Sequence, residues 1–207
     1  VKQAAEEFCA DLIVMGSRGL NPVQGFFMGS FTNTVLSQTK RPVLILRDTT
    51  PAPSAKKLRV GVALDGSKYG RAAVRYALRH ASLFGAGVYF YIINVVSDYA
   101  GAVMPDMAGM ALPSLSEEEV AELQKEEFEE AVAPLRPMFA KAGRRAKEIC
   151  LVGNPGDEIS NFAKKRKLDL IVMGTHGYGR FKAALLGSTA TRIAALSDVP
   201  LLIVRAA

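Results

Sequence analysis

The stretch that decides the fold is Asp169-Leu170-Ile171-Val172-Met173-Gly174, followed by a twelve-position loop and then by Gly187-Ser188-Thr189-Ala190-Thr191-Arg192. The apolar run before Gly174 carries no charge, as is typical of a strand buried in a parallel sheet. Gly187-Ser188 opens a run that can be helical. A strand, a glycine-bearing loop and a helix start form a common phosphate site, because glycines let the backbone approach an anion and the N–H groups of the first helical turn point at it.

The glycine spacing of this stretch separates it from two familiar phosphate loops. The dinucleotide fingerprint G-x-G-x-x-G is absent here. A Walker pattern nearly appears at Gly174-x4-Gly179, but Arg180-Phe181 follows in place of Lys and Ser/Thr. The sequence therefore favours neither a dinucleotide domain nor a P-loop NTPase. The spacing is G-x2-G-x9-G-S, carried by Gly174, Gly177, Gly187 and Ser188.

This spacing resembles the ATP-binding signature G-x2-G-x9-G-(S/T) of the universal stress protein family. The signature is loose by itself, but here a Leu-Ile-Val-Met strand precedes it, and an apolar helix and a second strand follow. The resemblance implies that the glycines and Ser188 hold the phosphates of ATP and that the backbone at Met173 contacts the nucleoside. Thr189 could add a second hydroxyl, and the loop residues His176 and Arg180 could meet the phosphates.

Three blocks of this region occur twice in the chain. Asp11-Leu12-Ile13-Val14-Met15-Gly16 repeats Asp169 to Gly174, Gly29-Ser30 repeats Gly187-Ser188, and Pro42 to Arg47 repeats Pro200 to Arg205. Each block lies 158 positions before its repeat, as positions 16 and 174 or 42 and 200 show, so no insertion or deletion is needed. Matched blocks in register predict an internal duplication. The repeated phosphate-site candidates are Gly16, Gly19, Gly29 and Ser30.

The repeat predicts the domain organisation. Residues 57–207 make one whole unit, residues 1–48 match only the last third of that unit, and residues 49–56 resemble a short, fairly stiff linker. We therefore expect a tandem-type protein whose first domain is incomplete here. Nothing in residues 1–48 can match the first two strands of the whole unit, so a complete second nucleotide pocket is not expected from this part alone.

The whole unit alternates strands and helices. Apolar strands are predicted at 58–64, 88–96, 146–152, 170–173 and 201–204, with helices between them. One helix is predicted to start at Ser116, where Glu119 completes a capping box, and another over 157–167 after a turn at 153–156. Such alternation predicts an α/β fold with an open parallel five-stranded sheet and helices on both faces. The resemblance implies the adenine nucleotide α-hydrolase-like version of this fold. Ligands of such sheets lie beyond the carboxyl ends of the strands, where the strand order reverses.

Two further candidates lie at such strand ends. Asp65 follows the first strand of the unit and Val95 lies near the end of the second. In the family that the sequence resembles, the acidic residue after the first strand contacts the nucleoside, and the adenine packs near the end of the second. A carboxylate suits the first task because it accepts hydrogen bonds from ribose hydroxyls or from the adenine amine. Alternatively, Asp65 is only a turn residue and Val95 only a core residue.

Composition narrows the function classes. Nearly half of the 207 residues are apolar, yet no apolar run approaches the roughly 20 residues of a membrane span. The net charge of +6 is spread along the chain, and its densest run, Lys164 to Lys167, closes a predicted helix, where cations suit the helix dipole. Nucleic-acid binding is therefore disfavoured. Two histidines are too few for a zinc site. Cys9, in a predicted helix, and Cys150, in a predicted strand, are predicted to be buried thiols, with a disulfide or redox pair as the alternative.

Catalysis has little support in the sequence. No Asp or Glu lies between Gly174 and Arg192 to orient a water or hold Mg²⁺, which fast NTPases usually need. We therefore predict an ATP-binding, regulatory stress protein with little or no hydrolysis; Mg²⁺ is left open. Two alternatives stay open: an adenylating or ATP-hydrolysing enzyme on a related fold, and a protein-interaction scaffold that binds no nucleotide.

The resemblance also implies a cytoplasmic location and association through the last strand of each repeat. The strands concerned are Val43 to Leu46 and Leu201 to Val204. They could pair with each other as a pseudo-dimer or pair across chains in a homo-oligomer.

Overall fold

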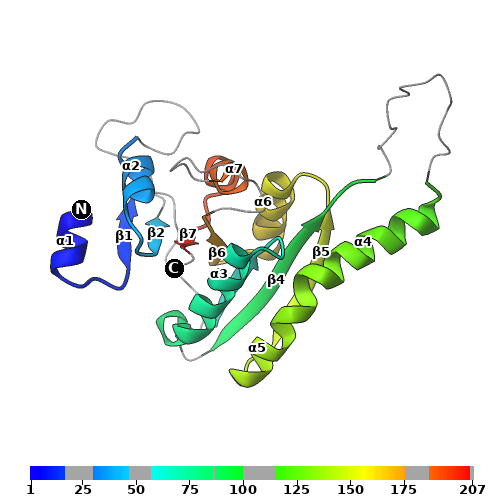
Figure 1. Cartoon of the computed structure of the whole chain (residues 1–207), viewed down its shortest axis with the longest axis horizontal. Coiled ribbons are helices and arrows are strands. Elements are labelled where there is room, and N and C mark those ends of the chain that lie inside the picture. The colour runs from blue at the N-terminus through cyan, green and yellow to red at the C-terminus, as the bar shows by residue number, and fades with distance from the viewer. Residues whose placement is uncertain (17–29, 47–56, 86, 100–114, 176–186, 206–207) are drawn as a thin grey trace.

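The computed structural model describes residues 1–16, 30–46, 57–85, 87–99, 115–175 and 187–205. Within these ranges the strands form one seven-stranded sheet in the order β1-β2-β7-β6-β3-β4-β5 (Figure 1). The strands are β1 (Ile13–Gly16), β2 (Val43–Leu46), β3 (Leu58–Ala63), β4 (Val88–Val96), β5 (Ala146–Val152), β6 (Leu170–Gly174) and β7 (Leu201–Val204).

The strands of the whole unit confirm the predicted fold class. β3 to β7 lie in the order β5-β4-β3-β6-β7, and each neighbouring pair is parallel. The chain adds strands outward from β3 on one side, through β4 to β5, and then returns to add β6 and β7 on the other side. The strand order therefore reverses at β3, between its neighbours β4 and β6, which is where open α/β sheets bind ligands.

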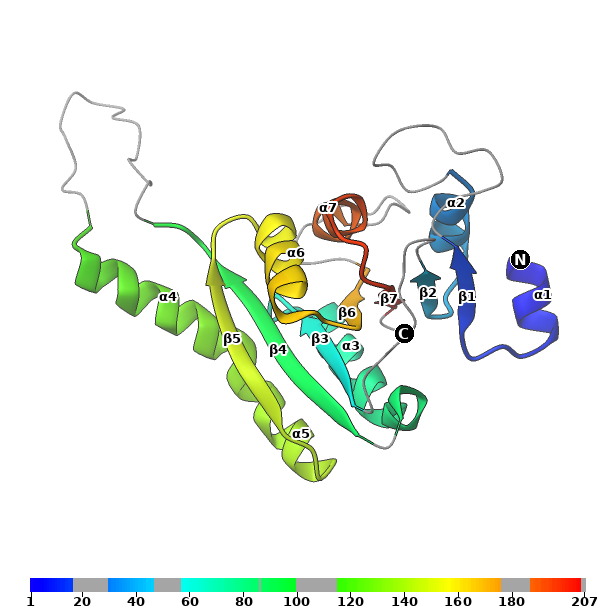
Figure 2. The same ribbon diagram turned by 180° about the vertical axis from the view of Figure 1, so that it is seen from behind.

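Helices cover both faces of this sheet (Figures 1 and 2). One face carries α3 (Lys68–Arg79), α4 (Glu117–Val132) and α5 (Arg136–Lys141), and the other carries α2 (Ser30–Gln38), α6 (Pro155–Arg166) and α7 (Ser188–Leu196). A short helix α1 (Lys2–Glu7) precedes β1. No helix within the described ranges is both long and apolar enough to cross a membrane.

The side chains of the strands contribute to two separate hydrophobic cores, one on each face of the sheet. Ile92 and Ile93 are neighbours in β4 and both are buried, yet Ile92 packs with α3 and α4 while Ile93 packs with α6 and α7. Successive residues of a strand point to opposite faces, so strands covered on both sides read as continuous apolar runs. This explains why the predicted strands of the whole unit carry so few charges.

Local capping chemistry sets the helix starts. Ser67 caps α3 by accepting a hydrogen bond from Gly70 N at 3.2 Å, and Ser116 with Glu119 forms the predicted capping box of α4. The start of α6 was predicted at Asp157, and this is wrong. Asn154 Oδ1 accepts from Gly156 N at 3.0 Å, and Pro155 suits the first helical position, so the helix starts two residues earlier.

The cysteine prediction is also wrong. Cys9 and Cys150 are both free and exposed. Cys9 was placed in a helix, but α1 ends at Glu7 and Cys9 has a positive φ of 49° in the turn that follows. Cys150 lies opposite Asn94 in β5, an edge strand that pairs with β4 on one side only within the described residues.

The first 46 residues repeat the last part of the chain in structure as well as in sequence. Helix α2 starts at Ser30 and α7 at Ser188, 158 residues later, and their ends keep the same separation. The strand register is also the same, because Val14 pairs with Leu44 in β1–β2 as Val172 pairs with Leu202 in β6–β7.

The two repeats meet through their last strands. β2 and β7 are antiparallel, with Leu44 opposite Leu202, so each central leucine faces its own counterpart in the other repeat. Arg205 adds a second link across this junction, because its Nη2 donates to Leu36 O of α2 at 2.6 Å. Of the two arrangements left open by the sequence, the structure shows pairing of these strands within one chain.

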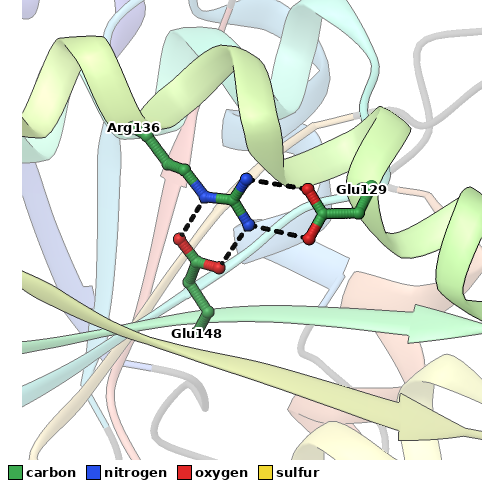
Figure 3. Close-up of polar contacts among 3 residues, drawn as sticks. All are labelled: Glu129, Arg136 and Glu148. Carbon is green, nitrogen blue, oxygen red and sulfur yellow. Dashed lines mark hydrogen bonds and ion pairs between the residues drawn. The ribbon is translucent and has the colours of Figure 1, made fainter.

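An arginine and two glutamates connect α4 and α5 to the edge strand β5. Arg136 contacts both carboxylate oxygens of Glu129 at 2.7 and 2.9 Å and both of Glu148 at 2.8 and 2.7 Å (Figure 3). Pro134 lies in a short 3-10 turn, Ala133–Leu135, that joins α4 to α5, and Pro137 lies in the first turn of α5. Arg136 thus fastens this junction to the sheet.

We expect Arg136→Gln to lower the Tm at neutral pH but not at pH 3. The hydrogen bonds from Arg136 hold the pKa of Glu129 below its usual range. A carboxylate with a depressed folded-state pKa stabilises the protein above its unfolded pKa of about 4.3, and this contribution is lost as the pH falls through the folded value. Thermal unfolding of both proteins from pH 7 to pH 3 measures the effect.

The matched control is Lys2→Gln, which removes one partner of the exposed pair Lys2–Glu6 at 4.0 Å. A single exposed pair of this kind contributes little, so its Tm should follow the wild type at every pH. A Tm difference for Arg136→Gln that persists undiminished at pH 3 would contradict the role of the carboxylates.

Candidate functional site

The site begins where β3 ends. Leu64 N donates to Ile93 O at 3.0 Å, which extends the ladder with β4 by one residue. Asp65 then turns the chain, and its Oδ1 accepts a hydrogen bond from Ser67 N at 3.0 Å. Gly66 follows with a φ of +78°, a left-handed conformation that favours glycine. Asp65 is half-buried at the start of α3, at the carboxyl edge of the sheet.

The end of β6 packs directly against this turn. A Cβ added at Gly174 would lie 2.7 Å from the carbonyl carbon of Tyr69 and 2.8 Å from its oxygen, distances too short for side-chain carbons. The backbone of β6 therefore touches the first turn of α3. The contact brings Gly174 and the Asp65 turn together, and it gives Gly174 a packing role that the spacing motif did not reveal.

Helix α7 starts beside the same strand end. Thr175 N donates to Val204 O at 3.1 Å, and Gly187 N donates back to Thr175 O at 3.0 Å. Gly187 is the N-cap of α7, and no side chain within the described residues caps the helix there. The first-turn N–H groups, from Ser188 and Thr189 onward, are thus directed at the sheet edge, and such a turn attracts anions.

The nucleoside candidates lie on the face of α7. Val95 and Met173 both pack with the core beneath α6 and α7, where Met173 is 8% exposed and Val95 is half-buried. Helix α3 leaves β3 on the opposite face, so α3 and α7 flank the carboxyl ends of the paired strands β3 and β6 from opposite faces. An acceptor at Asp65, an apolar wall and an uncapped helix turn could together hold a ligand with a polar ring and an anionic tail.

Arg192 adds a cation one turn into α7. Its Nε donates to Asp157 Oδ1 of α6 at 2.9 Å, which raises the pKa of the guanidinium. The stem of Arg192 crosses Gly156, where an added Cβ would lie 2.7 Å from its Cβ and Cδ. This contact holds the starts of α6 and α7 side by side at the carboxyl edge.

The structure therefore brings most predicted site residues of the whole unit to one edge of the sheet. His176, Gly177 and Arg180 fall outside the described residues, as do Gly19 and Gly29 of the first repeat. The residues brought together are Asp65, Val95, Met173, Gly174, Gly187, Ser188 and Thr189.

The candidates of the first repeat lie elsewhere. β1 and β2 run antiparallel to the other five strands, so Gly16 ends its strand at the opposite edge of the sheet from Asp65. Helix α2, which starts at Ser30, follows that edge, and Thr32 Oγ1 donates to Gly16 O at 3.3 Å. Gly16 and Ser30 therefore cannot share a pocket with Asp65.

One residue near the site was missed in the sequence. Asn94 is only 3% exposed, and its Nδ2 donates to Leu64 O at 3.1 Å, just before Asp65. The available signal was a lone amide within the apolar run Val88 to Val96. No group of three or more residues that could hold a metal ion occurs within the ranges that the structure describes.

Comparison with known proteins identifies relatives over most of the chain. The model of the universal stress protein family matches residues 1–47 and 58–205. A universal stress protein of Methanocaldococcus jannaschii is 35% identical over 147 residues, which are 71% of this chain and 81% of that protein. One of Mycolicibacterium smegmatis is 26% identical over 196 residues, 95% of this chain and 62% of the relative.

Solved structures share the fold. A universal stress protein from Archaeoglobus fulgidus has a TM-score of 0.66 at 24% identity, covering 98% of this chain and 64% of that one. One described as a putative universal stress protein from Pseudomonas aeruginosa has a TM-score of 0.67 at 17% identity, covering 99% and 66%. This chain thus spans about two thirds of the length of these longer relatives. The family model matches nearly every residue, and the chain belongs to the universal stress protein family.

Proposed function

We propose that this protein binds ATP at the carboxyl edge of β3, β4 and β6. The observation that carries the proposal is the start of α7, which no side chain among the described residues caps and which begins beside a strand end that packs against the Asp65 turn. A nucleoside at Asp65 would then have its phosphates within reach of the backbone N–H groups of the first turn of α7.

Each residue has a separate role in the proposal. The carboxylate of Asp65 accepts hydrogen bonds from the ribose hydroxyls or the adenine amine, since an ionised carboxylate is an acceptor only. Val95 packs against the base, and the backbone at Met173 contacts the nucleoside. The phosphates lie against Gly187 and accept hydrogen bonds from Ser188 and Thr189. By resemblance to the family signature, His176, Gly177 and Arg180 complete the phosphate loop.

Slow or absent hydrolysis is part of the proposal. The segment between Gly174 and Arg192 contains no carboxylate to orient a water or hold Mg²⁺. Any Mg²⁺ would therefore come with the phosphates. We infer a regulatory role in the stress response, in which the bound nucleotide rather than its turnover carries the signal, and a cytoplasmic location; both rest on family membership.

We also propose a tandem organisation, with residues 1–48 as the last third of a first domain, 49–56 as linker and 57–207 as a complete domain. The equal strand registers of the two repeats support it. In this arrangement the β2–β7 pairing is a pseudo-dimer contact, and Gly16, Gly19, Gly29 and Ser30 form the phosphate half of a second site.

We expect ATP to raise the Tm of the purified protein. A ligand present at 100 times its Kd stabilises the folded state by about 2.7 kcal/mol. For a chain of this size that corresponds to a shift of roughly 5–10 °C. Differential scanning fluorimetry with ATP, with and without Mg²⁺, measures the shift, and release of inorganic phosphate tests hydrolysis in the same samples.

Inorganic triphosphate is the control for binding of the phosphate chain alone, and GTP is the control for recognition of the base. A failure of every adenine nucleotide to raise the Tm would contradict ATP binding and favour an interaction scaffold. Rapid phosphate release would instead favour an ATP-hydrolysing enzyme. Mass spectrometry of small molecules released from the purified protein would show directly whether a nucleotide is retained.

A further inference from the structure

Asn94 is a costly residue for its position. It lies in β4 with 3% of its surface exposed, and its Oδ1 is buried with no hydrogen-bond partner within the described residues. An unsatisfied buried polar atom costs roughly 1–3 kcal/mol, whereas an apolar side chain of similar size would carry no such cost. Asn94 therefore has a role other than packing.

The contact that Asn94 does make fixes the peptide before Asp65. Its Nδ2 donates to Leu64 O at 3.1 Å, while Leu64 N is bonded to Ile93 O at 3.0 Å. Both polar groups of Leu64 are thus held by β4, one by its backbone and one by the Asn94 side chain. The Leu64–Asp65 peptide is held in one orientation at the point where the chain leaves the sheet.

Asn94 does not face the proposed nucleotide. Residues alternate along β4, and Ile92 packs with α3 and α4 while Val95 packs with α6 and α7. Asn94 shares the face of Ile92, opposite the face of Val95. Its effect on a ligand would therefore pass through Asp65. The Oδ1 atom of Asp65 accepts a hydrogen bond from Ser67 N at 3.0 Å, so the carboxylate has a defined direction.

We propose that Asn94 is a positioning residue that orients Asp65 toward the nucleoside by holding the Leu64 carbonyl. The proposal rests on the proposed nucleotide site. It assigns the selectivity of that site for the nucleoside to the buried side-chain amide of Asn94, which touches no ligand. Holding a recognition group within about half an ångström of its productive geometry requires such supporting contacts.

The test compares Asn94→Leu with Asp65→Asn. Isothermal titration calorimetry is run with ATP, 2′-deoxy-ATP, 3′-deoxy-ATP and inosine triphosphate. The affinities of Asp65→Asn show which of these analogues Asp65 distinguishes from ATP. We expect Asn94→Leu to lose the same distinction, by about 10-fold, the effect of losing one hydrogen bond to a charged group. The affinity ratio of ATP to AMP, which reports the phosphate contacts, should stay unchanged.

Val96→Ala is the matched control. Val96 is buried in the same strand, and its truncation destabilises β4 without removing the donor to Leu64 O. It should lower the Tm and keep the nucleoside selectivity. Asn94→Ser, which is too short to bridge the strands, serves as a second variant if the leucine variant does not fold, with the same expected loss.

A second readout needs no nucleotide. In NMR spectra of the free protein, the amide signals of Asp65 and Gly66 should shift and broaden in Asn94→Leu and not in Val96→Ala. Unchanged signals, full selectivity in the Asn94 variants, or an equal affinity loss for every analogue would each overturn the positioning role. If the wild type binds no adenine nucleotide while the amide signals shift, the proposed site fails and Asn94 keeps only a structural role.

Discussion

ATP at a concentration that raises the Tm of the wild type is expected to raise the Tm of Gly187→Val by at most about half as much. Gly187 is the N-cap of α7, and the bond from its N–H to Thr175 O at 3.0 Å places it beside the end of β6, next to the first-turn N–H groups of the proposed phosphate site. A branched side chain there would fill the space above the first-turn N–H groups. Overpacking of a contact costs roughly 1–3 kcal/mol, so the affinity should fall about 10- to 100-fold.

The fold of this variant should be preserved. Gly187 has φ −57° and ψ 151°, an extended conformation that valine adopts readily, so no backbone strain is introduced. Leu196→Val, in the last turn of α7 and far from its start, is the control and should keep the full ATP effect. Equal protection of Gly187→Val and the wild type by ATP would mean that the phosphates do not bind at α7.

Sequence patterns were sufficient for the fold class because its determinants are local. The continuous apolar runs of β4 and β6 require burial on both faces, and the caps at Ser67 and Ser116 mark helix starts with hydrogen bonds between near neighbours. Such contacts span three residues or fewer, so the pattern contains them fully. The start of α6 was misplaced because Asn154 and Pro155 were interpreted as a turn, although the same residues suit a cap and a first helical position.

Only one feature of the site could be predicted from the sequence, namely that the carboxyl ends of the parallel strands meet at one edge of the sheet. That Asp65 and Gly174 share an edge follows from parallel strands, but that Gly174 touches Tyr69 depends on how closely α3 packs on β6. Asn94 was missed for the same reason, since its bond to Leu64 O joins residues 30 positions apart. The direction of β1 and β2 could not be predicted either, because repeats of one sequence can join in parallel or antiparallel fashion.

The antiparallel junction has a consequence for how two sites could coexist. Because Leu44 faces Leu202, the repeats are related by a local two-fold arrangement, and their strand ends point to opposite edges. A phosphate site at Gly16 and one at Gly174 would therefore be separated by the sheet. Electrostatic repulsion between two polyphosphates would be weak across such a separation, since exposed charges more than about 10 Å apart are largely screened.

Gly174→Ala is expected to destabilise the protein strongly, whether or not ATP is present. The added Cβ would lie 2.7 Å from the Tyr69 carbonyl carbon and Cβ and 2.8 Å from its carbonyl oxygen, so α3 would have to move away from β6. Helix α3 also covers the buried Val62 and Val172, and its displacement would open that core. We expect a loss of about 1–3 kcal/mol in the free energy of unfolding, measured by urea denaturation.

A double-mutant cycle identifies the origin of the loss. Two of the three short distances are to Tyr69 backbone atoms, so Tyr69→Gly should relieve only a small part of the cost of Gly174→Ala. Gly187→Ala is the matched glycine control, because its extended backbone accepts alanine without strain, and its stability without ATP should equal that of the wild type. If Gly174→Ala kept full stability and lost only ATP binding, the glycine would serve only to let the phosphates approach the backbone. A loss of stability without nucleotide would instead show that β6 needs this glycine so that α3 can pack against it. That contact between β6 and α3 is the one that brings Asp65 to the site.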